Sequence, residues 1–182
     1  MCGGAGTRLG GEAEKPLVDV GGTPMVDRVR AALAASRIET VYLAVSPRTP
    51  ATRDHLRAAG ANVVETPGDG YVPDLTAALD RVGRPALTVA ADLPLLTAEA
   101  VNRVLDAGTD AEGSLTVAVP VDLKRRLGVS VDTSVEHDGR RLAPAGVNVV
   151  AGTDDGIYES DDPRLAVNVN HPSDLQVAEA LS

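Results

Sequence analysis

Aromatic side chains and cysteine are scarce in this chain of 182 residues, which has no Phe, no Trp, three Tyr and one Cys. The single cysteine, Cys2, excludes an internal disulfide framework and is typical of a protein kept in a reducing compartment. No apolar run approaches the length of a membrane-spanning helix, about eighteen residues, and no signal peptide is visible. We therefore expect a cytoplasmic protein without a membrane span.

Lysine is also scarce, and the chain carries a net negative charge. Only Lys15 and Lys124 occur against fifteen arginines, and the formal net charge is −9. Nonspecific binding to nucleic acid requires a basic surface, so this balance argues against a nucleic-acid partner. An anionic ligand would need a locally basic site within a globally acidic field, which makes Lys15, inside a glycine-rich segment, a candidate for such a site.

The hydrophobic content of 43% is ordinary for a globular protein, and the length fits one domain, residues 1–182. Apolar β-rich runs alternate with helical patterns, which indicates βαβ units and a mostly parallel sheet. The pair Asp138-Gly139 predicts a hairpin, so we expect an antiparallel excursion in the last third of the chain. The predicted strands are 41–45, 62–65, 86–90, 115–121, 147–151 and 165–169, and the predicted helices are 24–35, 50–60, 74–82, 97–105 and 173–181.

The most informative segment is the glycine-rich start of the chain, residues 1–17. Glycine permits a positive φ and a close approach of the backbone to a ligand, so successive N–H groups can point at phosphate oxygens. This segment predicts a triphosphate-binding loop in which Arg8 and Lys15 supply full positive charges. The loop residues are Gly3, Gly4, Ala5, Gly6 and Thr7.

The loop differs from the two commoner nucleotide-binding loops. A P-loop requires Gly-Lys-Ser/Thr at its end, whereas Lys15 follows Glu14. The dinucleotide fingerprint requires a strand before the loop. Only Met1 and Cys2 precede the glycines, so the first strand of a parallel sheet is expected to be missing from this sequence.

Two further segments carry polar groups suited to a ligand. Asp92 follows a predicted buried strand, where ligands bind in open α/β sheets, and is either a Mg²⁺ ligand or a turn residue before a helix. Asn168 and Asn170 lie on one face of an extended segment, so both amides can reach the same ligand. Asp174 is suited to favour the positive end of the last helix, which Asn170 or Ser173 can cap.

The sequence resembles a known family through these segments together. The order Gly-Gly-x-Gly-x-Arg-Leu-Gly, then Lys-Pro-Leu after four residues, is similar to the signature loop of nucleotidyltransferases built on a Rossmann-like sheet. Ala-Asp-Leu-Pro-Leu resembles their metal-binding segment, and residues 168–174 resemble their closing Asn-x-Asn motif. Residues 46–50, 68–75 and 144–150 look like segments of the stand-alone, archaeal-type adenosylcobinamide-phosphate guanylyltransferases, within the molybdenum-cofactor-guanylyltransferase-like superfamily.

This resemblance implies a three-layer α/β/α Rossmann-like nucleotidyltransferase fold and transfer of GMP from GTP to adenosylcobinamide phosphate. It implies catalytic roles for Arg8, Lys15 and Asp92, and Mg²⁺ held by Asp92 with Asn170. It also implies nucleotide contacts from the loop, Gly146 and Asn148. The partners are then GTP and a phosphorylated corrinoid acceptor, and a homodimer is compatible with the resemblance.

Three questions stay open at this level. A molybdenum-cofactor guanylyltransferase would use the same chemistry on a pterin phosphate, and a catalytically silent nucleotide-binding module is the alternative of another class. Tyr71 is either a stacking group or a half-buried core residue. The groups that read guanine lie among the loop backbone, residues 46–49 and residues 66–71, and spacing does not choose between them.

Overall fold

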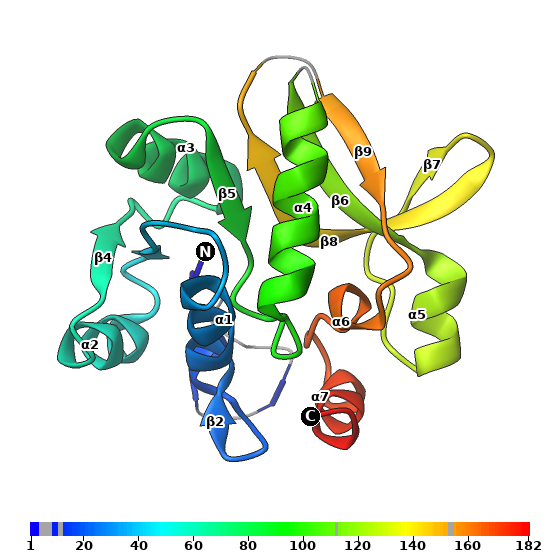
Figure 1. The fold of residues 1–182 in the computed structure, drawn as a ribbon. Coiled ribbons are helices and arrows are strands. Elements are labelled where there is room, and N and C mark those ends of the chain that lie inside the picture. Colours follow the sequence, from blue (N-terminus) through cyan, green and yellow to red (C-terminus); the bar gives the residue numbers. More distant parts are fainter. Residues whose placement is uncertain (4–8, 11–12, 112, 153–154) are drawn as a thin grey trace.

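The computed structural model describes residues 1–182 except 4–8, 11–12, 112 and 153–154 (Figure 1). The helices are η1 (Lys15–Leu17), α1 (Met25–Ala34), α2 (Pro50–Ala58), α3 (Tyr71–Val82), α4 (Ala98–Asp110), α5 (Val121–Leu127), α6 (Pro163–Ala166) and α7 (Pro172–Ala180). The strands are β1 (Asp19–Val20), β2 (Thr23–Pro24), β3 (Tyr42–Val45), β4 (Asn62–Glu65), β5 (Ala86–Val89), β6 (Ser114–Pro120), β7 (Val135–His137), β8 (Arg140–Val150) and β9 (Asp155–Glu159). No helix of the described part is long and apolar enough to cross a bilayer.

The strands form two sheets, in which β3 runs parallel to β4, and β5, β6 and β9 share one direction while β8 runs in the other. β3 and β4 pair in parallel, and a second sheet has the order β5-β8-β6-β9 with β7 paired to β8. The expected antiparallel excursion is confirmed, but β8 enters between β5 and β6 and pairs antiparallel with both. The predicted hairpin joins β7 to β8 through a two-residue turn at Asp138 and Gly139, which both have positive φ values, as a type I′ turn requires.

Met1 and Cys2 join the two sheets. The Cys2 N–H donates to the Ala44 carbonyl of β3 at 2.8 Å, and the Ala91 N–H, just beyond β5, donates to the Met1 carbonyl at 3.1 Å. The terminal amino group donates to the Val89 carbonyl at 2.7 Å. A cavity of about 610 Å³ lies beside these residues, lined largely by apolar side chains of α1, α3, β3 and β5. Met1 and Cys2 thus stand where a strand between β3 and β5 would pair.

Helices cover both faces of the sheet at β3, as a three-layer arrangement requires. Successive strand residues point to opposite faces. Leu43 packs with Val26 of α1, whereas Ala44 packs with Ala78 of α3. In Figure 1, α1 and α4 lie side by side in front of the strands, and their contact agrees with this view.

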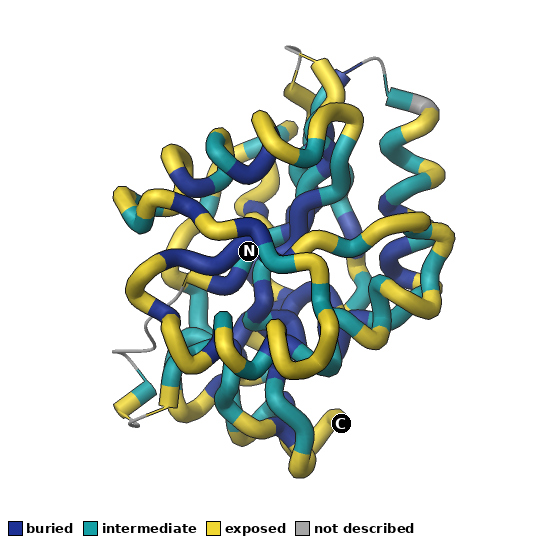
Figure 2. The backbone as a smooth tube through the Cα atoms, turned by 90° about the vertical axis from the view of Figure 1, so that its left-hand side faces the viewer, coloured by how far each residue is buried: buried dark blue, intermediate teal, exposed yellow. Residues whose placement is uncertain are grey.

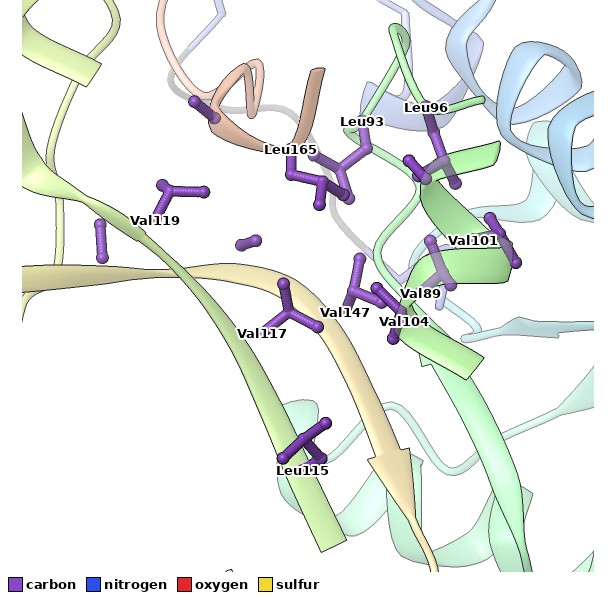
Figure 3. Close-up of a cluster of buried hydrophobic side chains, with 14 of the residues drawn as sticks. Val89, Leu93, Leu96, Val101, Val104, Leu115, Val117, Val119, Val147 and Leu165 are labelled. Carbon is purple, nitrogen blue, oxygen red and sulfur yellow. The ribbon is translucent and has the colours of Figure 1, made fainter. Parts of the chain in front are cut away.

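The main core lies between α4 and the sheet of β5, β8 and β6 (Figure 3). Its side chains come from alternate strand positions, such as Leu115, Val117 and Val119 of β6. Figure 2 shows the buried chain running through the centre of the molecule and exposed segments on its outer turns. This packing fixes the end of β5, where Asp92 follows.

The predicted strand at 165–169 is wrong. Residues 163–166 form the short helix α6, because Pro163 occupies its first turn and the Asp162 side chain accepts a hydrogen bond from the Arg164 N–H at 2.9 Å. The residues that follow are buried at Val167 and Val169 but belong to no strand. They lead an extended segment past the end of β5 and into α7.

Candidate active site

Three residues from distant parts of the sequence meet at the end of β5. The Lys15 Nζ donates to Asp92 Oδ2 at 2.6 Å and to Asn170 Oδ1 at 2.6 Å. Lys15 begins η1, Asp92 follows β5, and Asn170 precedes α7. Each was predicted as a site residue, and the structure brings all three together.

The Lys15–Asp92 ion pair is largely shielded, since the side chains are only 16% and 17% exposed. Its members are held by the backbone around them: the Val169 N–H donates to the Asp92 carbonyl at 3.0 Å. The pair is therefore less screened by solvent and salt than a surface ion pair. A residual open face lets an anionic ligand reach the ammonium.

The oxygen atoms around Lys15 fit a hard cation. Asp92 Oδ2 and Asn170 Oδ1 converge on one cationic nitrogen in this structure. Mg²⁺ is usually bound by one or two protein oxygens, with phosphate oxygens and waters completing its shell. Among the described residues, no group of three or more His, Cys, Asp or Glu side chains is placed to hold a metal. These two oxygens therefore fit a Mg²⁺ ion whose remaining ligands are phosphate oxygens and waters.

Asn168 holds the other oxygen of Asp92. Its Nδ2 donates to Asp92 Oδ1 at 3.3 Å and to the Ala145 carbonyl at 3.0 Å. Asn168 is 8% exposed, whereas Asn170 points its oxygen at Lys15. The two amides therefore act on different groups of one site: Asn168 binds Asp92 Oδ1, and Asn170 binds the ammonium that holds Asp92 Oδ2.

Gly146 makes this arrangement possible. It has φ of +77°, and a Cβ there would lie 3.0 Å from the Ala90 Cβ and 3.5 Å from Asn168 Nδ2. The Ala90 N–H donates to the Gly146 carbonyl at 2.8 Å, which ties β8 to the residues just before Asp92. Glycine is needed here for the close approach of two chain segments.

Asn148 lies further along β8, away from the three converging groups. Its Nδ2 donates to Thr88 Oγ1 at 3.3 Å. Thr88 also shares a hydrogen bond with the Tyr71 side chain. Partial burial raises the pKa of the Tyr71 hydroxyl, the Thr88 hydrogen bond opposes that shift, and the negative charge of Asp92 adds to it. Tyr71 is 53% exposed and lines the same cleft as Asp92, so it is not a core residue.

A cleft of about 370 Å³ extends from Asp92 and Lys15 toward the ends of β3 and β4. At its far side Asp74 is 6% exposed, and its Oδ1 accepts a hydrogen bond from the Gly68 N–H at 2.7 Å. A Cβ on Gly3 would lie 3.5 Å from Ser46 Oγ and 3.8 Å from Asp74 Oδ2. The cleft is lined by Met1, Gly3, Lys15, Pro16, Ser46, Arg48, Gly68, Gly70, Tyr71, Asp74, Ala90, Ala91 and Asp92.

Sequence reasoning missed Asp74 as an individual site residue. The sequence did offer a signal for it: Asp74 lies within residues 68–75, which resemble a family segment, and it falls in the first turn of α3. Of the predicted loop, the structure places Gly3 in the cleft. Gly4, Ala5, Gly6, Thr7 and Arg8 lie outside the described residues.

Asp174 closes the segment that carries both Asn residues. Its fully buried carboxylate accepts hydrogen bonds from the Asn170, His171 and Ser130 N–H groups at 2.7–2.9 Å, and from Ser130 Oγ at 2.8 Å. Burial disfavours the charged form, but these hydrogen bonds outweigh it and lower the pKa of Asp174. Asp174, rather than Asn170 or Ser173, secures the start of α7, and it fixes the backbone of Asn170.

Comparison with known proteins agrees with this geometry. Residues 1–129 match the family described as the MobA-like NTP transferase domain. Adenosylcobinamide-phosphate guanylyltransferase of Methanocaldococcus jannaschii is 32% identical over 196 residues, covering 100% of this chain and 94% of that protein.

Solved structures share the fold. A CMP:2-keto-3-deoxy-manno-octonic acid synthetase complexed with CTP superposes with a TM-score of 0.68 at 16% identity, covering 92% of this chain and 91% of the other. A Bacillus anthracis protein assigned as a glucose-1-phosphate thymidylyltransferase has a TM-score of 0.69 at 15% identity, covering 99% and 92%. The architecture is therefore the α/β nucleotidyltransferase fold.

Proposed function

Because the chain belongs to the MobA-like NTP transferase domain family, we propose that it transfers GMP from GTP to adenosylcobinamide phosphate and releases pyrophosphate. The full-length similarity to the Methanocaldococcus jannaschii guanylyltransferase supports this choice of acceptor. The single structural observation that carries the transfer chemistry is the convergence of Lys15, Asp92 and Asn170 at the mouth of the cleft.

The reaction needs alignment and charge neutralisation more than proton transfer. The acceptor phosphate is already anionic at neutral pH, so one of its oxygens attacks the α-phosphorus of GTP without a general base. A P–O bond forms to the acceptor, the bond between the α-phosphorus and the bridging oxygen breaks, and pyrophosphate leaves with the electron pair. Preorganised positive charge is the main source of rate in such a transfer.

Lys15 supplies that charge from the protein side. Its ammonium bridges Asp92 and Asn170 in this structure, and we propose that it donates to phosphate oxygens when the triphosphate enters the cleft. Asp92 and Asn170 would hold Mg²⁺, which when bound neutralises charge on the transferring phosphate. Arg8 and the amides of the glycine loop are proposed to hold the leaving pyrophosphate.

The far side of the cleft is suited to the base. Guanine presents N–H donors along one edge, and the buried Asp74 carboxylate presents an acceptor oxygen beside Gly3 while its other oxygen is held by Gly68. Ser46 lies next to the same position and is 4% exposed. We propose that Asp74 selects guanine. Its buried carboxylate at the far side of the cleft supports this choice among the segments that spacing left open.

Pyrophosphate release measured with GTP and each acceptor tests the proposal. We expect turnover with adenosylcobinamide phosphate and little with a pterin phosphate. Turnover with the pterin alone would favour a molybdenum-cofactor guanylyltransferase instead. If the chain binds GTP but an Asp92→Ala variant matches the unaltered chain in every transfer assay, a silent nucleotide-binding module becomes the better account.

A further inference from the structure

The second of the two lysines, Lys124, is buried behind the site. It lies on α5 and is 4% exposed, and its Nζ donates to the Ala166 carbonyl at 2.7 Å and to Asn168 Oδ1 at 3.1 Å. Burying an ammonium is costly unless hydrogen bonds and nearby charges compensate it. Burial lowers the pKa of Lys124, while the negative charges of Asp174, Asp92 and Asp132 oppose that shift. Because burial of this ammonium is costly, we ask which group of the site it holds in place.

Hydrogen-bond chemistry links Lys124 to the orientation of Asn168. An ammonium has donors and no acceptor, so it accepts only the oxygen end of the Asn168 amide as a neighbour. The amide nitrogen must then face the opposite way, toward Asp92 Oδ1 and the Ala145 carbonyl, as the structure shows. Were the amide reversed, its oxygen would face both the carboxylate and the carbonyl, and two acceptors would repel it.

Each oxygen of Asp92 is therefore held by a path that includes a lysine. Lys15 binds Oδ2 directly, and Lys124 acts on Oδ1 through Asn168. The two lysines are more than a hundred residues apart in the sequence, and together they hold both oxygens of the carboxylate. Carboxylates that bind metals are commonly fixed by such outer partners, whose loss costs about 10- to 100-fold in metal affinity or activity.

We propose that Lys124 is a positioning residue that fixes the Asn168 amide so that Asp92 directs Oδ2 toward the phosphate and metal side of the cleft. This role rests on the proposed function, because it assigns Asp92 to the nucleotide–metal site. It concerns no contact between Lys124 and substrate. Its effect should appear in metal–nucleotide binding before any acceptor is added.

The test measures Mn²⁺ binding in the presence of GTP by electron paramagnetic resonance, without acceptor. Lys124→Met is expected to raise the Kd for Mn²⁺ about tenfold. Arg125→Met is the matched control, because Arg125 is on the same helix, pairs with Asp122 and is 61% exposed. An unchanged Kd in Lys124→Met would overturn the proposal.

A double-mutant cycle separates positioning from a general loss of structure. Asn168→Leu alone should also raise the Kd about tenfold, and Lys124→Met with Asn168→Leu should raise it no further, because both act through one path. Additive effects of about 100-fold would contradict action through Asn168. If Lys124→Met alone does not fold, the double variant, which leaves neither an unpaired ammonium nor an unpaired amide, is compared with Asn168→Leu, and a further rise of about tenfold in its Kd would contradict action through Asn168.

Failure of this inference is distinguishable from failure of the proposed function. If the unaltered chain binds Mn²⁺ with GTP but transfers GMP to no acceptor, the proposed function fails. The Kd values for Mn²⁺ in the double-mutant cycle still test the role of Lys124. A crystal structure of Lys124→Met supplies a readout independent of binding. We expect the 3.3 Å contact between Asn168 and Asp92 Oδ1 to be lost, and its retention would overturn the proposal.

Discussion

Replacing Lys15 by Met removes the ammonium that joins Asp92 and Asn170 while keeping most of the side-chain volume. At a separation of about 4 Å and an effective dielectric constant of about 20, one unit charge pair is worth about 4 kcal/mol. Because Lys15 is 16% exposed, some of this is lost to solvent, and we expect a loss of about 2–4 kcal/mol of transition-state stabilisation. That corresponds to about a 30- to 1000-fold fall in kcat/KM for GTP.

Continuous measurement of pyrophosphate release gives this quantity directly. Arg57→Met is the control, since Arg57 pairs with Glu65 on the surface and such pairs contribute little. Folding of Lys15→Met should be nearly unchanged, because Asp92 keeps its hydrogen bond from Asn168 and some solvent contact. A kcat/KM within threefold of the Arg57→Met variant would refute the role of Lys15 in holding phosphate.

Four further predictions follow from the same contacts. Gly146→Ala must keep a positive φ and meets Ala90 at 3.0 Å, so thermal denaturation should show a loss of about 1–3 kcal/mol; an unchanged melting temperature would contradict the close approach. Asp174→Asn should lose about 2–3 kcal/mol at pH 7. Because the folded pKa of Asp174 is lowered, its contribution is complete above its unfolded pKa of about 4 and is lost as pH falls through the folded value. The stability of the variant should therefore vary less as pH falls below about 4. Asp74→Asn should reduce the ratio of kcat/KM for GTP over ATP at least tenfold, and an unchanged ratio would place guanine recognition elsewhere. Five added apolar residues before Met1 should fill the cavity beside β3 and β5 and raise the melting temperature by at least about 4 °C, whereas five added Gly and Ser residues should not.

Strand ends were the most predictable part of the site. Asp92 follows an apolar run whose direction is fixed by the preceding helix, and ligands in α/β sheets bind at that edge. Asn170 could be predicted because an alternating pair of amides in an extended segment shares a face. Lys15 was identifiable because lysine is otherwise almost absent from the chain. Local sequence made these three residues candidates, and the family resemblance supplied the roles expected of them.

Contacts made through burial could not be predicted in the same way. The helix that carries Lys124 was not predicted, because residues 115–121 were assigned to one strand and the chain turns into α5 at Val121. The position of β8 between β5 and β6 depends on pairing between residues far apart in the sequence, such as Val89 with Val147 and Leu115 with Val149. Local propensity does not encode such pairing. Asp74 likewise becomes a site residue only when α3 folds against the end of β3.

We propose that this chain moves the α-phosphate of GTP, with its guanosine, onto a phosphorylated corrinoid. The direct measurement incubates GTP labelled at the α-phosphorus with adenosylcobinamide phosphate and Mg²⁺, and separates the products by chromatography. We predict label in a corrinoid product together with unlabelled pyrophosphate, and about a 100-fold lower rate with Asp92→Asn. Label that remains in GTP or appears only as free GMP, or equal transfer by Asp92→Asn, would contradict the claim.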